Sequence, residues 1–586
     1  MNNNRIIRIA IVSAWFIAVF LFWRLACWGL MNYHEELQMF LFTSTFFKNS
    51  VSTVGGLADY VTQFLVQFFV NPSIGAAIVA ALVVLVQILS YQIIRRITSS
   101  NIGFELSFIP SVAALCVMGY FETMLTALVS IVIGLALVCL LLNIKRANVH
   151  IIATIAVGLV AYFLAGTAAM LITILCTAAC DLVTKSIKAK AAVLLAFSSL
   201  TVFIAAIIAH TFGTHSLNAL LKGIWYMRIP TEFPTALYVT VFATVVTILF
   251  SGLVSKKINK TSSAVVLLIL IVGGSYLAIQ KCYDPDREEL LEYSCMARQK
   301  EWKKIIKAAE KQRPVWVIEH NYLNLALAKT NLLSTRAFEV DQQKSPSLFV
   351  PFMRHHTMCI SAGEVFYYLG FTNLARRHYS ESLGAIPNHY LSVRYIKRMA
   401  EIDLINRDWK SAEKYLRLLQ HTLFYDEWAS QRLNECQNHA EYKADSEYGE
   451  IRSYRLTDDF LQPSDNYGNI IVELVRHNPQ NRMAWDYALI SQLLDKNISL
   501  FVQYFLNYVK HYSELPPVYQ EAVLFAWAMS NQDMNNIPYN ISSITKKRFN
   551  FFMNTLKNNQ RNAALLLQKD YGNSVWYYLF DKTNDQ

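Results

Sequence analysis

The chain has 586 residues, of which 54% are hydrophobic and only 16% are charged. A single soluble domain is rarely this long or this apolar. Residues 1–280 hold 16 of the 53 Lys/Arg and 7 of the 42 Asp/Glu, so they carry +9 of the net charge of +11. This basic excess lies in loops between apolar runs, whereas a nucleic-acid partner requires a basic stripe on a folded face. We therefore expect no nucleic-acid partner.

Nine runs in the first half are apolar enough to cross a membrane, because a helix needs roughly 20 apolar residues to span a ~30 Å hydrocarbon core. They lie near 9–30, 73–93, 103–119, 124–143, 148–165, 167–184, 191–211, 236–254 and 263–279. The third, fifth and sixth runs are short or share a tight turn. We predict an all-α, polytopic module of about nine spans at 1–280, in contact with the lipid bilayer.

The loops of this module alternate in charge. One set carries 12 Lys/Arg, whereas the loops between them hold only Lys48, Lys222 and Arg228. Cytoplasmic loops are enriched in Lys and Arg, so we expect a cytoplasmic N-terminus. An odd number of spans then puts residues 281–586 outside the cytoplasmic membrane, in the periplasm if the cell is Gram-negative.

The first external loop, roughly residues 31–72, contains the segment "NYHEELQMF" with the adjacent carboxylates Glu35 and Glu36. Apolar residues then recur at helical spacing from Leu57 to Phe68, and Asp59 takes one of the other positions. This pattern predicts an amphipathic helix lying in the membrane interface. The acids are therefore expected on the outer surface, close to the membrane.

Further charged side chains are expected at the same level of the membrane: Glu122, Arg24, Lys222 and Arg228. Cations there would hold a lipid phosphate, and a carboxylate would take a proton from an acceptor hydroxyl. Glu35 and Glu36 are the first candidates for that base, with Asp59 and Glu122 behind them, and Arg24, Lys222 and Arg228 are the phosphate-binding candidates. The competing interpretation is that these are ordinary interfacial charges that keep loop ends hydrated.

Residues 281–586 have the apolar periodicity of soluble helices, and part of this tail resembles the tetratricopeptide repeat, a two-helix unit of about 34 residues. In "YYLGFTNLARRHYSESLGAIPNH", Gly370, Ala375, Tyr379 and Pro387 fall on the small, small, aromatic and proline positions of that repeat. Stacked helix pairs of this kind bind protein or peptide partners. The polar segment 438–460 is expected to interrupt the array as an exposed insertion.

Four cysteines lie in the tail or at its start, which would be an oxidising compartment in this topology. A disulfide between Cys282 and Cys295 is one possibility that the spacing allows. The sequence assigns no cofactor.

The segments "NYHEELQMFLF", "GGLADYVTQF" and "YYLG" resemble an uncharacterised Bacteroidota family of polytopic membrane proteins. The layout also resembles, more weakly, glycosyltransferases of the GT-C class, which have an acidic first external loop and often an external C-terminal domain. In that class an external carboxylate acts as base or divalent-metal ligand, which the resemblance maps to Glu35 or Glu36. It implies glycosyl transfer, or transfer of a related group, from a polyprenyl-phosphate donor at the outer face. The alternative is a non-enzymatic envelope scaffold whose repeat domain binds a partner.

Overall fold

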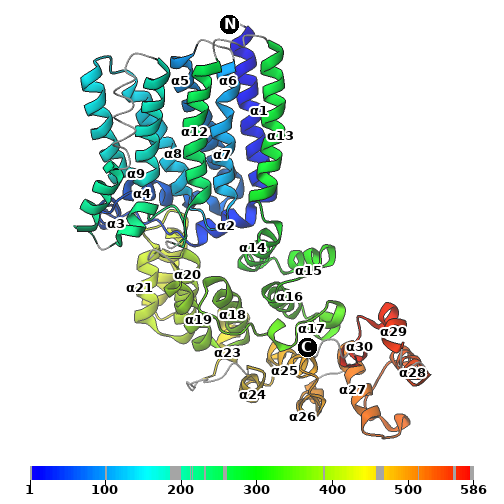
Figure 1. The fold of residues 1–586 in the computed structure, drawn as a ribbon. Coiled ribbons are helices and arrows are strands. Elements are labelled where there is room, and N and C mark those ends of the chain that lie inside the picture. The colour runs from blue at the N-terminus through cyan, green and yellow to red at the C-terminus, as the bar shows by residue number, and fades with distance from the viewer. Residues whose placement is uncertain are drawn as a thin grey trace. The chain divides into compact units, whose positions relative to one another are not determined.

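The computed structural model describes residues 3–98, 102–184, 200–211, 213, 215–229, 232–254, 261–386, 390–456, 467–511, 514–558 and 562–580. Within these ranges the regular elements are all helices, and one isolated antiparallel bridge joins Thr123 to Met227. The described part is therefore all-α, as predicted. Figure 1 shows the helices in order from the N-terminus in blue to the C-terminus in red.

The chain divides into two compact units. Unit 1 comprises residues 1–291 together with two short segments of the tail, Ile386–Val393 and Leu418–Glu427. Unit 2 comprises the remaining residues, 292–385, 394–417 and 428–586. The sequence predicted a single boundary near residue 280. The structure instead assigns two segments of the tail to unit 1.

Unit 1 is built around long apolar helices, with short helices at one end of them. In chain order they are α1 (Asn3–Ala26), α2 (Trp28–Glu36), α3 (Ser44–Val51), α4 (Gly56–Val66), α5 (Pro72–Ile97), α6 (Ile102–Leu106), α7 (Phe108–Gly119), α8 (Leu125–Leu141), α9 (Ala147–Thr184), α11 (Leu217–Lys222), α12 (Thr235–Val254) and α13 (Thr261–Cys282). We call the end that carries Arg8 the Arg8 end. Helices α2, α3 and α4 lie at the opposite end (Figure 1). Arg228 lies there too, because its Nη2 contacts His34 of α2, and we call this the Arg228 end.

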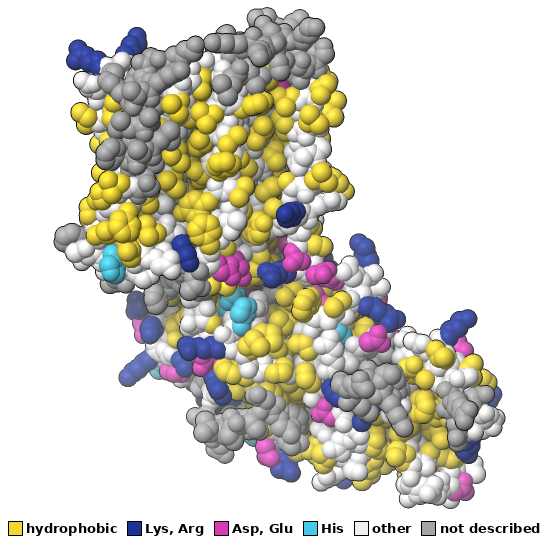
Figure 2. Space-filling model, viewed as in Figure 1, with side chains coloured by type: hydrophobic (Ala, Val, Ile, Leu, Met, Phe, Trp, Pro, Cys, Tyr) yellow, Lys and Arg dark blue, Asp and Glu magenta, His cyan; other side chains and the backbone are white. Residues whose placement is uncertain are grey.

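Six helices among the described residues are long and apolar enough to cross a membrane: Arg5–Ala26, Pro72–Ile97, Ile102–Gly119, Asn148–Thr184, Thr235–Gly252 and Val265–Cys282. Only 6% of the apolar window in the last of these is buried by the rest of the chain. Figure 2 shows hydrophobic side chains spread over the visible face of these helices. An apolar surface of this extent suits lipid rather than water.

The count of nine spans remains a prediction. The shorter apolar helices Leu125–Leu141 and Leu200–Thr211 fall on two of the predicted runs, and residues 191–199 of one run lie outside the described residues. The fifth and sixth runs both lie within α9. A turn at Gly166, with φ of 81°, breaks its helical geometry.

Helix α9 is a hairpin. A Cβ placed on Gly158 would touch Ile174, and His150 pairs with Asp181 at 3.2 Å. The two residues of each pair lie at nearly the same distance along the chain from Gly166, so the two arms of α9 face each other. A side chain at Gly166 is excluded twice. Its φ is positive, and its Cβ would lie 2.5 Å from the hydroxyl oxygen of Tyr226.

Helix α14 (Pro285–Arg298) begins in unit 1 and ends in unit 2. The other helices of unit 2 are α15 (Trp302–Lys311), α16 (Val317–Lys329), α17 (Leu333–Arg336), α18 (His356–Leu369), α19 (Thr372–Gly384), α20 (Val393–Asn406), α21 (Trp409–Leu419), α22 (Asp426–Gln437), α23 (Glu447–Tyr454), α24 (Tyr467–His477), α25 (Arg482–Leu494), α26 (Ile498–Tyr508), α27 (Pro517–Met529), α28 (Ser543–Asn558), α29 (Ala563–Tyr571) and α30 (Val575–Phe580). Consecutive helices pack in pairs, among them α15 with α16, α18 with α19, and α24 with α25.

The repeat-like positions lie at these pairings. Ala375 and Tyr379 are fully buried on α19, and a Cβ on Gly363 of α18 would contact the Tyr379 ring. Pro387 lies outside the described residues. The segment predicted as an exposed polar insertion at 438–460 is mostly exposed over 438–445, as expected. Its helix α23 instead buries Tyr448, Gly449 and Ile451, so this part packs into the unit.

All nine cysteines lie in the described ranges and none forms a disulfide, so the Cys282–Cys295 disulfide that the spacing allows is not formed. Cys295 is buried in α14. Cys282, at the end of α13, instead has a side-chain hydrogen bond with Cys116 of α7.

Candidate functional site

Two loops at the Arg228 end of unit 1 meet through a short antiparallel bridge. The amide N–H of Arg228 donates to the carbonyl of Glu122 at 2.7 Å, and the N–H of Met124 donates to the carbonyl of Tyr226 at 2.9 Å. This pairing sets the side chains of Glu122 and Arg228 next to each other, with Arg228 Nε 3.8 Å from Glu122 Oε2. The structure thus brings together two of the predicted site residues that are 106 positions apart.

The Arg228 side chain is buried, with 1% of its surface exposed. Its guanidinium lies 4.4 Å from the ring centroid of Tyr33, a cation–π contact, and its Nη2 lies 3.1 Å from Nδ1 of His34. Because arginine has donors and no acceptor, Nδ1 of His34 must be the acceptor. His34 is therefore neutral, with its proton on Nε2.

The charge state of His34 follows from its surroundings. Burial lowers the pKa of His34 well below its ordinary value, and the positive charge of Arg228 lowers it further. The imidazole thus stays uncharged at neutral pH and presents an N–H group.

Several donors in this cluster lack a hydrogen-bond partner within the described part of the chain: Nε and Nη1 of Arg228, and Nε2 of His34. A buried donor without an acceptor costs about 1–3 kcal/mol, and more when it is charged. Such donors usually mark a site that water or an anionic group fills. The cluster therefore has the chemistry of an anion site.

Helix α4 carries the second half of the site on an inward-facing polar stripe. Asp59, Thr62 and Gln63 are buried, whereas Val61 and Phe64 are exposed. This polarity is the reverse of that in a soluble surface helix and suits a helix whose apolar face meets lipid. The predicted helix is confirmed.

Asp59 is the centre of this half. Its carboxylate accepts hydrogen bonds from Tyr390 at 2.6 Å, from Gln63 at 2.7 Å and from Thr126 at 3.3 Å. Burial raises the pKa of Asp59 to about 6, although the three hydrogen bonds oppose that rise. The charge of Arg228 also acts on the hydroxyl of Tyr390, so the two halves of the cluster are electrostatically connected.

Glu122 complements this arrangement. Burial raises its pKa above the ordinary value, and Arg228 acts in the opposite direction. One buried acid (Asp59), one partly buried acid (Glu122) and one buried arginine thus occupy the same end of unit 1, and both acids have raised pKa values. Groups of this kind are typical of functional sites.

Glu35 and Glu36 are not at an exposed surface, which corrects the expectation from the sequence. Both lie in α2 with 2% and 6% of their surface exposed, respectively, and Glu35 accepts a hydrogen bond from Tyr425 at 3.1 Å. The start of α2 is held by Glu288, which accepts from the N–H groups of Gly29 at 2.6 Å and Leu30 at 3.1 Å. The pair is part of the packed structure at this end.

The other two proposed phosphate-binding cations, Arg24 and Lys222, have their described contacts outside the Arg228 cluster. Arg24 is near the end of α1 and donates to the hydroxyl of Ser73 at 3.0 Å. Lys222 is half-buried at the end of α11, and its carbonyl accepts from Tyr238 at 2.9 Å. Sequence reasoning missed His34 as a donor and Tyr390 as a partner of Asp59.

No group of three His, Cys, Asp or Glu side chains gathers as a metal site within the described ranges. Asp59 has both oxygens engaged by protein donors, and Glu122 faces the cation Arg228. The residues of the cluster therefore fit an anion better than a divalent metal.

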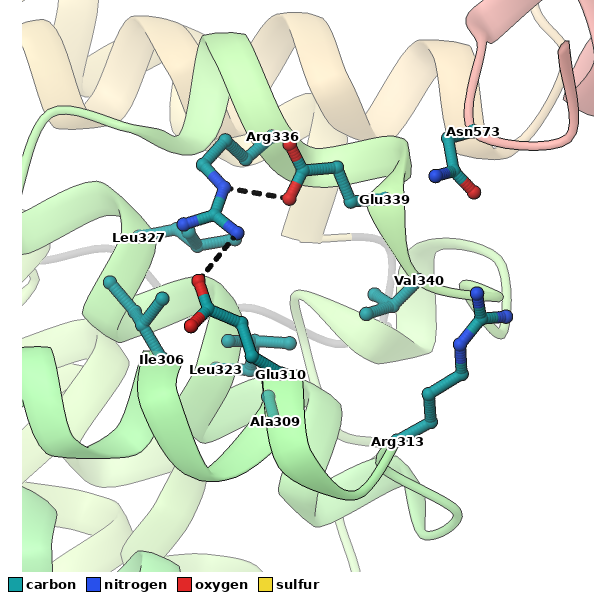
Figure 3. A pocket seen from close by; sticks show the side chains of 10 residues that line it. All are labelled: Ile306, Ala309, Glu310, Arg313, Leu323, Leu327, Arg336, Glu339, Val340 and Asn573. Carbon is teal, nitrogen blue, oxygen red and sulfur yellow. Dashed lines mark hydrogen bonds and ion pairs between the residues drawn. The ribbon is translucent and has the colours of Figure 1, made fainter. Parts of the chain in front are cut away.

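Unit 2 has a pocket of about 200 Å³, lined by residues of the α15–α17 region and by Asn573 (Figure 3). Arg336 points into it and is already paired with Glu339 at 2.6 Å and Glu310 at 2.9 Å. The volume of this pocket is below the usual range for small-molecule sites, about 300–1,000 Å³. The charge of Arg336 is also already neutralised by its two acidic partners. The Arg228 cluster is the stronger candidate.

One family comparison covers almost the whole chain. The model described as "Family of unknown function (DUF6057)" matches residues 4–582. The chain belongs to this family. No curated protein and no solved structure matches it. The expected membership of an uncharacterised family is confirmed, whereas the Bacteroidota origin and the resemblance to the GT-C class stay predictions, because the DUF6057 description assigns no activity.

Proposed function

We propose that this DUF6057 protein is an integral membrane protein that transfers a glycosyl or related group from a polyprenyl-phosphate donor at the outer face of the cytoplasmic membrane. In this arrangement the N-terminus is cytoplasmic and the Arg228 end of unit 1 faces outward. The observation that carries the proposal is the buried pair of Arg228 and His34. Their Nη1 and Nε2 donors have no hydrogen-bond partner among the described residues, and they lie in the same cluster as a carboxyl group with a pKa of about 6. The six apolar helices supply the lipid environment that such a donor requires.

Each residue has a defined part in this reaction. Arg228 and the Nε2–H of His34 donate to the phosphate of the donor. An acceptor hydroxyl attacks the anomeric carbon, the bond from that carbon to the phosphate oxygen breaks, and polyprenyl phosphate leaves. Asp59 takes the hydroxyl proton, a role for which a pKa near the working pH is favourable.

The test uses Asp59→Asn and Arg228→Lys in the full-length protein, with Asp286→Asn as the matched control because Asp286 is exposed at the start of α14. Loss of a catalytic base typically lowers the rate 10²–10⁴-fold. We expect both cluster variants to reach normal membrane levels and to reproduce the envelope glycan defect of a deletion strain. The control should keep the wild-type glycans. If deletion leaves every glycan unchanged, the transferase proposal is wrong.

A second candidate is a non-enzymatic envelope scaffold. It is favoured by the contacts that lock tail segments into unit 1, since Tyr390 and Tyr425 bind Asp59 and Glu35 directly. In this role the paired helices of unit 2, with their tetratricopeptide-like positions, bind a protein or peptide. Asp59→Asn would then change stability and leave glycans as they are in wild type.

A further inference from the structure

The Arg8 end of unit 1 contains a cleft of about 880 Å³ between α1, α5 and α6. It is lined by Arg5, Arg8, Ile9, Val12, Ser13, Gln87, Ile88, Tyr91, Arg95 and Phe104. Three of these ten residues are arginines and none is an acid. The volume lies within the range of small-molecule sites.

The arginines are arranged on two facing helices. Arg5 and Arg8 are one turn apart on α1, and Tyr91 and Arg95 are one turn apart on α5, so each pair shares a face. Arg8 is held in place by Tyr91, whose hydroxyl accepts from its Nη1 at 2.6 Å. Its guanidinium also lies 5.4 Å from the ring centroid of Phe104.

The charge of the cleft stays positive when its surroundings are included. Among the described residues, Glu105 on α6 is an acid that interacts electrostatically with Arg8, and it does not line the cleft. One carboxylate against three guanidinium groups leaves a cationic site. Arg5 and Arg95 are exposed, so their charges are accessible to a ligand.

Beside the arginines, the walls of the cleft combine apolar residues with the polar side chains of Ser13, Gln87 and Tyr91. Ile9, Val12 and Ile88 continue from the arginines along the helices. Gln87 is 1% exposed, and its Oε1 has no hydrogen-bond partner within the described part of the chain. The cleft thus offers three cations and an apolar wall that continues from them along the helices.

We propose that this cleft binds an anionic phospholipid, with the phosphate on Arg5, Arg8 and Arg95 and an acyl chain along Ile9, Val12 and Ile88. Basic pockets between spanning helices on the cytoplasmic side recognise anionic head groups in this way. The inference rests on the membrane placement proposed above and is independent of the transferase activity.

The experiment uses the full-length protein in nanodiscs of phosphatidylcholine, with and without phosphatidylglycerol, and counts the lipids retained by native mass spectrometry. Each arginine near an anionic surface is worth about 1 kcal/mol, or about fivefold in affinity. We expect Arg5→Gln and Arg95→Gln each to weaken phosphatidylglycerol retention about fivefold. Phosphatidylcholine has the same phosphate without net charge and should not be retained.

The matched control is Arg96→Gln. Arg96 adjoins Arg95, but it donates to the carbonyl of Cys139 at 3.0 Å and does not line the cleft. We expect it to retain phosphatidylglycerol as wild type does. An equal loss in Arg96→Gln would show a general surface charge effect and overturn the proposal. Displacement of the lipid by millimolar inorganic phosphate would also overturn it, because the site would then bind free phosphate.

Discussion

Asp59 holds its negative charge in a buried environment, which makes its contribution to stability depend on pH. Its pKa is raised from 3.8 to about 6 in the folded protein. Below about pH 4 the carboxyl is protonated in both the folded and the unfolded state, so it does not make the free energy of unfolding depend on pH. Between pH 4 and 6 the folded state holds the proton more tightly, so stability falls as pH rises through this window.

Asp59→Asn should remove this pH dependence. A shift of roughly two pKa units corresponds to about 3 kcal/mol in the free energy of unfolding. Wild type loses this stability by pH 7.5, whereas the variant does not. We expect the melting temperature of the variant, relative to wild type, to be higher at pH 7.5 than at pH 4.5. The measurement is thermal unfolding of the full-length protein in detergent at both pH values.

Asp286→Asn provides the comparison, because it removes a carboxylate that is exposed to solvent at the start of α14. If the difference in melting temperature between Asp59→Asn and wild type were the same at both pH values, the charge of Asp59 would not destabilise the folded protein. Since other acids titrate in the same range, only the difference between variant and wild type is informative.

The sequence could indicate which residue types gather at this end of unit 1, but not how they are covered. Asp59 meets Tyr390 across 331 positions, and Glu35 meets Tyr425 across 390. A pattern read within one segment contains no information about such distant partners. It is therefore understandable that Glu35 and Glu36 were predicted as exposed and that Asp59 ranked behind them.

At the scale of elements, the hairpin of α9 depends on the sharp turn at Gly166. That turn also contributes to the site, because the carbonyl of Ala165 accepts from the hydroxyl of Tyr226 at 2.6 Å, two residues before Arg228. The N–H of Ala168 in turn donates to the same hydroxyl at 3.0 Å. The backbone on both sides of the turn is thus tied to the loop that positions Arg228.

Gly166→Ala should destabilise unit 1, because the alanine would have to adopt a positive φ and its methyl group would clash with the Tyr226 hydroxyl. Strain of this kind costs on the order of 1–3 kcal/mol before the clash is added. Gly273→Ala is the control, because a Cβ on Gly273 meets nothing within 4 Å. We expect a lower apparent melting temperature for Gly166→Ala only. Equal melting temperatures would show that the turn tolerates a side chain.

Hydropathy located most of these elements well. The predicted runs 73–93 and 263–279 correspond to α5 and α13, because length and apolarity alone define a helix that suits lipid. Helical spacing also identified α4. The tight turn at Gly166 was expected, but its contact with Tyr226 was not, because that contact requires the fold of the loop before Arg228.

At the scale of the whole molecule, the distribution of basic residues supports the proposed orientation of unit 1, with the Arg8 end in the cytoplasm. Arg8 donates to Tyr91 near the end of α5, and Arg96 donates to Cys139 near the end of α8, so these arginines share the Arg8 end. Lys145 and Arg146 lie in the loop between α8 and α9. This is the charge pattern of a cytoplasmic face.

Fusion reporters test the direction. A reporter active only outside the cytoplasm should be active after Gln586 and silent when inserted at Lys145. The opposite pair of signals would place the Arg228 cluster on the cytoplasmic side and contradict the proposed outer-face reaction. A cytoplasm-specific reporter at the same two positions serves as the control, because it should give the reverse result.

Unit 1 is discontinuous in the chain, and this has a consequence for how the protein is made. Its last segment ends at Glu427, so the ribosome must add more than 130 residues after Leu291 before the unit is complete. The helices can enter the lipid while Asp59 still lacks the Tyr390 hydroxyl and Glu35 lacks that of Tyr425. The polar cluster is therefore assembled last, and a nascent chain halted before Tyr390 would be inserted yet unfinished.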